Sequence, residues 1–123
     1  MPYSIKWTES GVIWAYTGVL TGEELIESNL AIYSDPRFGT IRYQIVDLRA
    51  VMEFQVLQSH MEKVAELDVK ASVLNQSIKV AVVTNEVTGK HMNRTYSETV
   101  PESHWETKVF NDYLKACDWA KNA

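Results

Sequence analysis

The sequence has a single cysteine, Cys117, among its 123 residues, so it cannot form an internal disulfide. That count is typical of a reducing compartment, and we expect a cytoplasmic protein. No apolar run approaches the ~20 residues that a membrane-spanning helix needs, and the opening MPYSIKWTES has no apolar core of the signal-peptide kind. The chain also lacks repeats, low-complexity tracts and linkers. We therefore expect one domain over residues 1–123 and no membrane span.

Positive charge is also scarce. The chain has 12 Lys and Arg against 16 Asp and Glu, a formal net charge of −4, and no run of three basic residues. A nucleic-acid-binding face needs clustered basic side chains, so we expect no nucleic-acid partner. Hydrophobic residues make up 46% of the chain and charged residues 23%, which is the balance of an ordinary globular domain.

Complete catalytic and metal-binding motifs are missing as well. The three histidines, at positions 60, 91 and 104, show no HExxH or Cys-His spacing, and there is no GxSxG elbow. The stretch TGKHMN lacks both the first glycine and the hydroxyl after the lysine that a phosphate-binding loop needs. We therefore expect no enzyme, no metal and no cofactor. If a catalytic site exists, Asp47, Glu53 and His91 are its acid–base candidates.

The first part of the chain predicts a β-hairpin and a helix. In YSIKWTESGVIWAYTG, two strand patterns flank a short turn that contains Gly11. TGEELIESNLAIYSDP then has helical spacing, a capping box formed by Thr21 and Glu24, and Pro36 as its stop.

The rest of the chain alternates between strand and helix patterns. IRYQIVDL predicts a strand and RAVMEFQV an irregular stretch, before a helix that begins between Val56 and Ser59 with a capping box of Ser59 and Glu62. SIKVAVVT predicts a buried strand and TGKHMNRTYSETV a third helix. WETKVF predicts a last strand, followed by a helix capped by Asn111.

The predicted order of elements is therefore β-β-α-β-α-β-α-β-α. Strands that alternate with helices need crossover connections, which place the strands parallel and cover the sheet with helices. We predict an α/β fold in which a β-hairpin is followed by alternating helix–strand units, in a mostly parallel five-stranded sheet covered by four helices.

This order, together with GVLTGEEL, IVDLRAV, VAVVT and VFNDYLKACDWA, resembles the STAS-like, SpoIIAA-like group of bacterial proteins. The resemblance extends over nearly the whole chain and is greatest to the small single-domain members, which are related in fold to CRAL-TRIO lipid-binding domains. It implies a non-enzymatic regulatory or interaction module that binds a protein partner or itself. The kinship with lipid-binding domains leaves an alternative, which is a carrier or sensor of a small apolar or anionic ligand.

The sequence departs from the group where anti-sigma-factor antagonists carry their phosphorylated serine. The group has an Asp-Ser-Ser-Gly-like turn shortly after a strand end, and a serine there accepts the phosphate. Asp47 and Leu48 match the strand end, but EFQV (53–56) occupies the turn. The resemblance therefore does not carry the phosphorylation switch to this chain.

Polar residues follow the ends of two predicted strands. Ligands of an open α/β sheet bind beyond the carboxyl ends of its strands, and Asp47 and Thr84 lie at two such ends. The rim that we expect to contact a ligand or partner consists of Asp47, Arg49, Glu53, Thr84, Asn85, Lys90 and Arg94. Asp47 has a second interpretation: it accepts hydrogen bonds from its own turn and pairs with Arg49 or Lys90.

Two further features have alternative interpretations. The predicted helix start near Thr88 either presents backbone N–H groups to an anion, helped by Lys90 and Arg94, or is a solvated surface. For the carrier alternative, a pocket between the second and third helices would be lined by apolar side chains beside the rim, namely Met52, Phe54, Val56 and Leu57.

Aromatic residues are abundant, with four Trp and six Tyr. If Tyr3, Trp7, Trp14 and Tyr16 of the predicted hairpin face outward, they form a surface for a homodimer or another partner; if they face inward, they cover the sheet. The resemblance to the family favours a homodimer, and both arrangements of these side chains remain open. We expect Cys117 to be a small buried hydrophobic residue.

Overall fold

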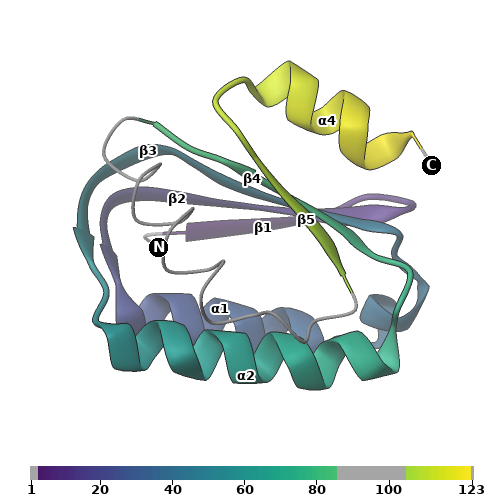
Figure 1. Ribbon diagram of the computed structural model, residues 1–123, viewed down its shortest axis with the longest axis horizontal. Helices are drawn as coiled ribbons and strands as arrows, with labels where there is room; N and C mark the ends of the chain where they lie inside the picture. Colours follow the sequence, from purple (N-terminus) through teal and green to yellow (C-terminus); the bar gives the residue numbers. More distant parts are fainter. Residues whose placement is uncertain (1–2, 86–104, 123) are drawn as a thin grey trace.

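The computed structural model describes residues 3–85 and 105–122, which form one sheet with helices on both of its faces (Figure 1). The strands are β1 (Tyr3–Trp7), β2 (Gly11–Thr21), β3 (Tyr43–Gln55), β4 (Lys79–Val83) and β5 (Glu106–Phe110). The α-helices are α1 (Gly22–Tyr33), α2 (Gln58–Leu74) and α4 (Tyr113–Lys121), and a 3-10 helix, η1, spans Pro36–Thr40.

The sheet is mixed, with the strand order β1-β2-β3-β4-β5. The short connection between β1 and β2 makes that pair antiparallel, whereas the crossovers through α1 and α2 make β2–β3 and β3–β4 parallel, and β4–β5 is also parallel. The sheet is therefore mixed and not mostly parallel as expected. The described residues form three α-helices, where four were expected. The helix predicted near Thr88 lies outside the described residues.

Strand β3 is longer than the sequence pattern predicts. It continues through RAVMEFQ to Gln55, where we expected an irregular stretch. Its register with β2 shifts twice, since Ala15 and Thr17 pair with Asp47 and Ala50. A second shift follows between Gly18 and Val19 of β2. Extra residues of this kind are β-bulges, and they break the polar–apolar alternation by which a strand is recognised.

The N-cap at Thr21, one half of the expected capping box, is confirmed. The Thr21 hydroxyl accepts a hydrogen bond from the Glu24 N–H at 3.2 Å, and α1 ends at Tyr33, ahead of Pro36. The N-terminus of α1 also carries Glu23 and Glu24, where the helix dipole favours negative charge.

The expected caps of two later helices are wrong. Helix α2 begins at Gln58, within the expected range of Val56 to Ser59, but its N-cap is Leu57 and not Ser59. The His60 imidazole takes the place of the usual polar cap by accepting a hydrogen bond from the Leu57 N–H at 3.0 Å. Helix α4 is capped by Asp112, whose carboxylate accepts from the Lys115 N–H at 3.1 Å, and not by Asn111.

Two apolar layers hold the fold together. Helices α1 and α2 lie side by side under one face of the sheet, and α4 covers part of the other (Figure 1). The larger layer, under α1 and α2, contains Trp14, Leu20, Ile32, Val51 and Val64, among others. The smaller layer, under α4, contains Tyr43, Ile45, Ala81, Val83, Ala116 and Ala120.

The aromatic residues of the hairpin face inward, which is the second of the two arrangements that the sequence left open. Tyr3, Trp14 and Tyr16 are buried and stack against one another, with ring centroids 5.8 and 6.3 Å apart. Trp7 is partly buried and packs against the same layer. No helix among the described residues is long and apolar enough to cross a membrane.

Candidate functional site

The first residue of the expected rim, Asp47, lies inside β3 and is held by Arg49. Its Oδ1 accepts from the Arg49 backbone N–H at 3.1 Å and from Nε at 2.9 Å, and its Oδ2 accepts from a terminal guanidinium nitrogen at 2.8 Å. The Asp47 side chain is 14% exposed and that of Arg49 is 51% exposed. The structure therefore contains the local pairing that the sequence left as one of two interpretations.

This pairing controls the ionisation of Asp47. Partial burial acts to raise the pKa of the Asp47 carboxyl, but the side-chain and backbone hydrogen bonds from Arg49 outweigh it, so the pKa lies below its ordinary value. The same hydrogen bond raises the pKa of the Arg49 guanidinium. Asp47 is therefore a carboxylate with a fixed counter-ion, which is a poor arrangement for a general acid or base near neutral pH.

Helix α4 closes over the pair from the outer face of the sheet. The guanidinium carbon of Arg49 lies 4.2 Å from the ring centroid of Tyr113, in the geometry of a cation–π contact. Burial, followed by a hydrogen bond with Cys117, raises the pKa of Tyr113. Cys117 itself is partly buried against the layer under α4, which agrees with the expected packing role but not with full burial.

Thr84 and Asn85 follow β4, and both donate hydrogen bonds to main-chain carbonyls of neighbouring strands. The Thr84 hydroxyl and N–H both donate to the Phe110 carbonyl, at 3.3 and 2.8 Å. The Asn85 Nδ2 donates to the carbonyls of Arg49 and Val51, at 3.0 and 2.8 Å. These carbonyls lie past Asp47, the last residue of β3 that pairs with β4, so the amide of Asn85 satisfies acceptors that the sheet leaves open.

Glu53 belongs to a different surface from Asp47. It pairs in register with Val19 on the part of β2 and β3 that extends past β4, where Leu20 and Phe54 turn toward the core. Lys90 and Arg94 lie outside the described residues. Among the described rim residues, Asp47, Arg49, Thr84 and Asn85 lie together, because Asp47 pairs with Val83 and Asn85 donates to the Arg49 carbonyl. Glu53 lies apart on the extended ribbon.

The sequence named Met52 and Leu57 only as lining of a pocket, and it did not predict that they project into solvent on this ribbon and just past its end. Val19 is 40% exposed, Met52 is 76% exposed and Leu57 is 65% exposed. We refer to Val19, Met52, Glu53 and Leu57 together as the ribbon surface. The signal was obscured because an apolar residue at a bulge cannot be assigned to the inner or outer face from alternation alone.

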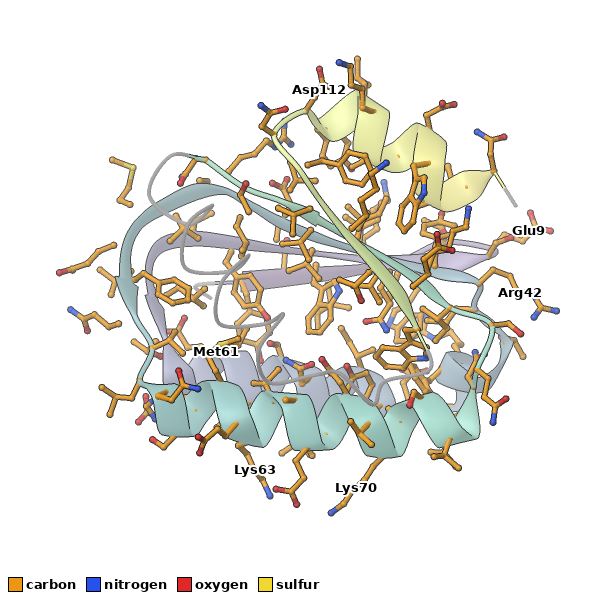
Figure 2. The ribbon with its side chains drawn as sticks, viewed as in Figure 1. Glu9, Arg42, Met61, Lys63, Lys70 and Asp112 are labelled. Atoms are coloured by element: carbon orange, nitrogen blue, oxygen red, sulfur yellow. The ribbon has the colours of Figure 1, made fainter. Side chains whose placement is uncertain are left out.

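A second feature that the sequence did not suggest is an open depression of about 650 Å³ at the opposite ends of the parallel strands. Its lining includes Glu9, Arg42, Lys79 and Lys121, and Figure 2 shows Glu9 and Arg42 at this end of the molecule. The Lys79 ammonium donates to the carbonyls of Trp119 and Asn122, at 3.2 and 2.8 Å. The depression is a mixed-charge surface whose central cation secures the end of α4.

Within residues 3–85 and 105–122, no three His, Cys, Asp or Glu side chains converge as metal ligands would. His60 contributes to the start of α2, as described above, and His91 and His104 lie outside the described residues.

Comparisons with known proteins show the fold. No family model matches the sequence, and no curated protein is significantly similar to it. An anti-sigma factor antagonist from Mycobacterium paratuberculosis has 13% identity, with 98% of this chain and 93% of that chain covered and a TM-score of 0.64. The anti-sigma factor antagonist SpoIIAA in its unphosphorylated form has 10% identity, coverage of 98% and 97%, and a TM-score of 0.61.

A third solved structure is an uncharacterised protein of the DUF3478 family, described as having a SpoIIAA-like fold, from Shewanella loihica PV-4. It has 18% identity, covers 96% of this chain and 91% of that chain, and has a TM-score of 0.61. This chain has a SpoIIAA-like fold. The sequence resemblance predicted that fold, and the three likenesses over nearly the full chain confirm it.

Proposed function

We propose that this protein is a non-enzymatic regulatory module that binds another protein, or a second copy of itself, through the ribbon surface. The observation that carries the proposal is its likeness, over 98% of the chain, to two anti-sigma factor antagonists. Such a protein, by its name, acts on an anti-sigma factor, and a fold used in that way is a scaffold for protein contacts. Fold alone does not decide function, so the contact surface must come from this chain's own residues.

The ribbon surface supports the proposal because it exposes apolar groups that the core does not use. Met52 and Leu57 are exposed although neighbouring side chains of β3, such as Val51 and Phe54, pack inward. Exposed apolar side chains with a single charge beside them, here Glu53, are typical of a contact surface. The proposed partner therefore presents an apolar patch with a basic residue opposite Glu53.

The proposal does not include a phosphorylation switch. Residues 49–55, which follow the matched strand end, contain no hydroxyl side chain and continue as strand β3. Ser59 is exposed in the first turn of α2 and does not cap that helix. The proposed binding therefore does not depend on phosphate at a serine of that turn.

The carrier alternative at the rim has less support. Its four expected lining residues separate in the structure: Phe54 and Val56 pack against the core, whereas Met52 and Leu57 project into solvent. The predicted third helix, which would form the other wall of that pocket, lies outside the described residues, and Asp47 already has Arg49 as its counter-ion.

The test compares Met52→Glu with Val73→Glu, a matched control at the far end of α2 whose wild-type side chain is 62% exposed. We expect both variants to fold with unchanged stability. Met52→Glu should lose self-association in sedimentation equilibrium, or should no longer retain the protein captured by wild type from its host, while Val73→Glu retains it. A chain that stays monomeric and captures the same proteins in all three forms would rule the proposal out.

A further inference from the structure

A cavity of about 40 Å³ lies between the sheet and helices α1 and α2, on the face opposite Asp47 and α4. Strands β2, β3 and β4 form one wall of it, and α1 and α2 form the other. Figure 2 shows the α2 side: Met61, which lines the cavity, points from the helix toward the sheet, whereas Lys63 and Lys70 point away into solvent. The cavity is thus inside the larger apolar layer.

Two buried polar side chains lining this cavity have polar atoms without a hydrogen-bond partner among the residues that the structure describes. Gln44 on β3 is 1% exposed, and in the described part of the chain neither its Oε1 nor its Nε2 has a partner. Trp14 on β2 is 3% exposed, and its Nε1–H is unpartnered as well. Buried polar groups are almost always satisfied, because leaving them without partners is costly. These atoms therefore mark a place where a further molecule fits.

The remaining polar groups of the cavity wall restrict the charge of that molecule. Tyr16 is hydrogen-bonded to Ser28, and the Tyr33 hydroxyl donates to the Asp68 carboxylate. Asn29 is turned to its own helix, where its Nδ2 donates to the Leu25 carbonyl at 2.7 Å. A buried carboxylate in the wall makes an anion unfavourable in a medium of low dielectric. The cavity is suited to an uncharged molecule.

The volume of the cavity and the polar atoms in its wall further restrict which molecule can bind there. At ~10–15 Å³ for each water-sized group, the cavity has room for about three such groups. A single water that bridges Gln44 and Trp14 would leave about two thirds of the cavity empty against its apolar walls. A single small molecule that carries a hydrogen-bond acceptor and a donor on adjacent atoms can bind both Gln44 and Trp14. The rest of that molecule then contacts the valine and methionine side chains of the wall.

We propose that this cavity binds an uncharged ligand through a primary-amide group. The ligand's carbonyl oxygen accepts from the Nε1–H of Trp14 and from the side-chain amide of Gln44, and its own N–H donates to Gln44 Oε1. This site is independent of the ribbon surface, because it lies across the sheet and uses none of the same residues.

The experiment uses formamide as the probe and follows the indole N–H of Trp14 and the side-chain amide of Gln44 by 1H–15N NMR. Both signals should shift saturably, with a dissociation constant in the millimolar range expected for so few atoms. N,N-dimethylformamide, which lacks the N–H and is larger, should not compete. Gln44→Met should weaken binding about tenfold or more, because it removes the hydrogen-bonding groups at similar volume.

Two further variants make the result decisive. Gln55→Met, on the exposed end of the same strand, should bind formamide as wild type does. Trp14→Phe keeps a ring in place, removes the donor, and should weaken the shifts at Gln44 about tenfold. Shifts that stay linear in formamide, shifts that persist in both cavity variants, or a crystal structure with ordered water as the sole occupant under saturating formamide would overturn the proposal.

Discussion

At the scale of residues, the chain contains two Asp-x-Arg triplets with the same geometry. Asp35 accepts from the N–H and Nε of Arg37 at 2.9 and 3.0 Å, and the guanidinium lies 4.4 Å from the centroid of Trp7. Asp47 and Arg49 repeat this arrangement over Tyr113. One triplet begins a 3-10 helix and the other lies in a strand, so the pairing follows from the local sequence rather than from a ligand.

The first prediction concerns Asp47→Asn, which removes the charge and keeps the size. Because the folded-state pKa of Asp47 is lowered, its stabilisation is present above the unfolded value of ~3.9 and is lost as pH falls through the folded pKa. We expect the variant to lose ~1 kcal/mol of unfolding free energy at pH ~7, a modest figure because Arg49 is half exposed.

Urea unfolding of both proteins between pH ~7 and pH ~2 measures this effect, and their stabilities should converge at the acid end. Asp35→Asn is the matched control in the other triplet, where hydrogen bonds from Arg37 lower the pKa of Asp35 to about 2. A stability curve for Asp47→Asn that runs parallel to wild type at all pH values would show that Arg49 does not hold the carboxylate.

At the scale of elements, the sequence predicted most strands and helices, but not the features that depend on contacts between them. The pairing of Asp47 with Arg49 spans two residues, and it was among the interpretations the sequence offered. The cap of α2 is different, since His60 is not a standard capping residue. The hydrogen bonds from the Asn85 amide to the β3 carbonyls lie beside the two β-bulges, and hydrophobic periodicity does not reveal where bulges occur.

The second prediction tests the contact between the starts of α1 and α2. A Cβ at Gly22 would overlap the His60 imidazole, so Gly22→Ala must displace the ring that accepts the Leu57 N–H. We expect a loss of ~1–3 kcal/mol in unfolding free energy. Gly39→Ala is the control, since a Cβ there meets nothing within 4 Å, and it should change stability by less than ~0.5 kcal/mol.

A double-mutant cycle isolates the cause. In a His60→Ala background, Gly22→Ala should no longer destabilise the protein, because the clash is gone and alanine is the better helix former. If the loss caused by Gly22→Ala is the same with and without the imidazole, the close approach is not its origin.

At the scale of the whole molecule, Asn75 joins three segments that lie far apart in the sequence. Its Nδ2 donates to the carbonyls of Phe38 and Ile41, both at 2.9 Å, and its own carbonyl accepts from the Nε1–H of Trp105 at 2.7 Å. Residues of this kind couple the helical layer to the last strand. The sequence does not predict this role, because an asparagine that follows a helix indicates only where the helix ends.

The third prediction is that Asn75→Ala destabilises the entire molecule by ~2–4 kcal/mol, since it leaves two buried carbonyls without donors. Asn122→Ala, which removes an exposed amide at the end of α4, should cost much less. Tryptophan fluorescence and far-UV circular dichroism during denaturant unfolding should lose signal together at a lower midpoint. An unfolding midpoint equal to that of wild type would show that Asn75 does not hold the layers together.

The strand order also has a consequence for how the chain is made. Every described strand after the first pairs with the strand immediately before it in the sequence. On the ribosome, the β1–β2 hairpin can therefore form first. Strands β3, β4 and β5 can then each pair with the edge strand already in place as they emerge, because no later strand has to insert between them. Synthesis from the N-terminus and growth of the sheet then proceed in the same direction, which limits the time that any unpaired edge is exposed to other chains.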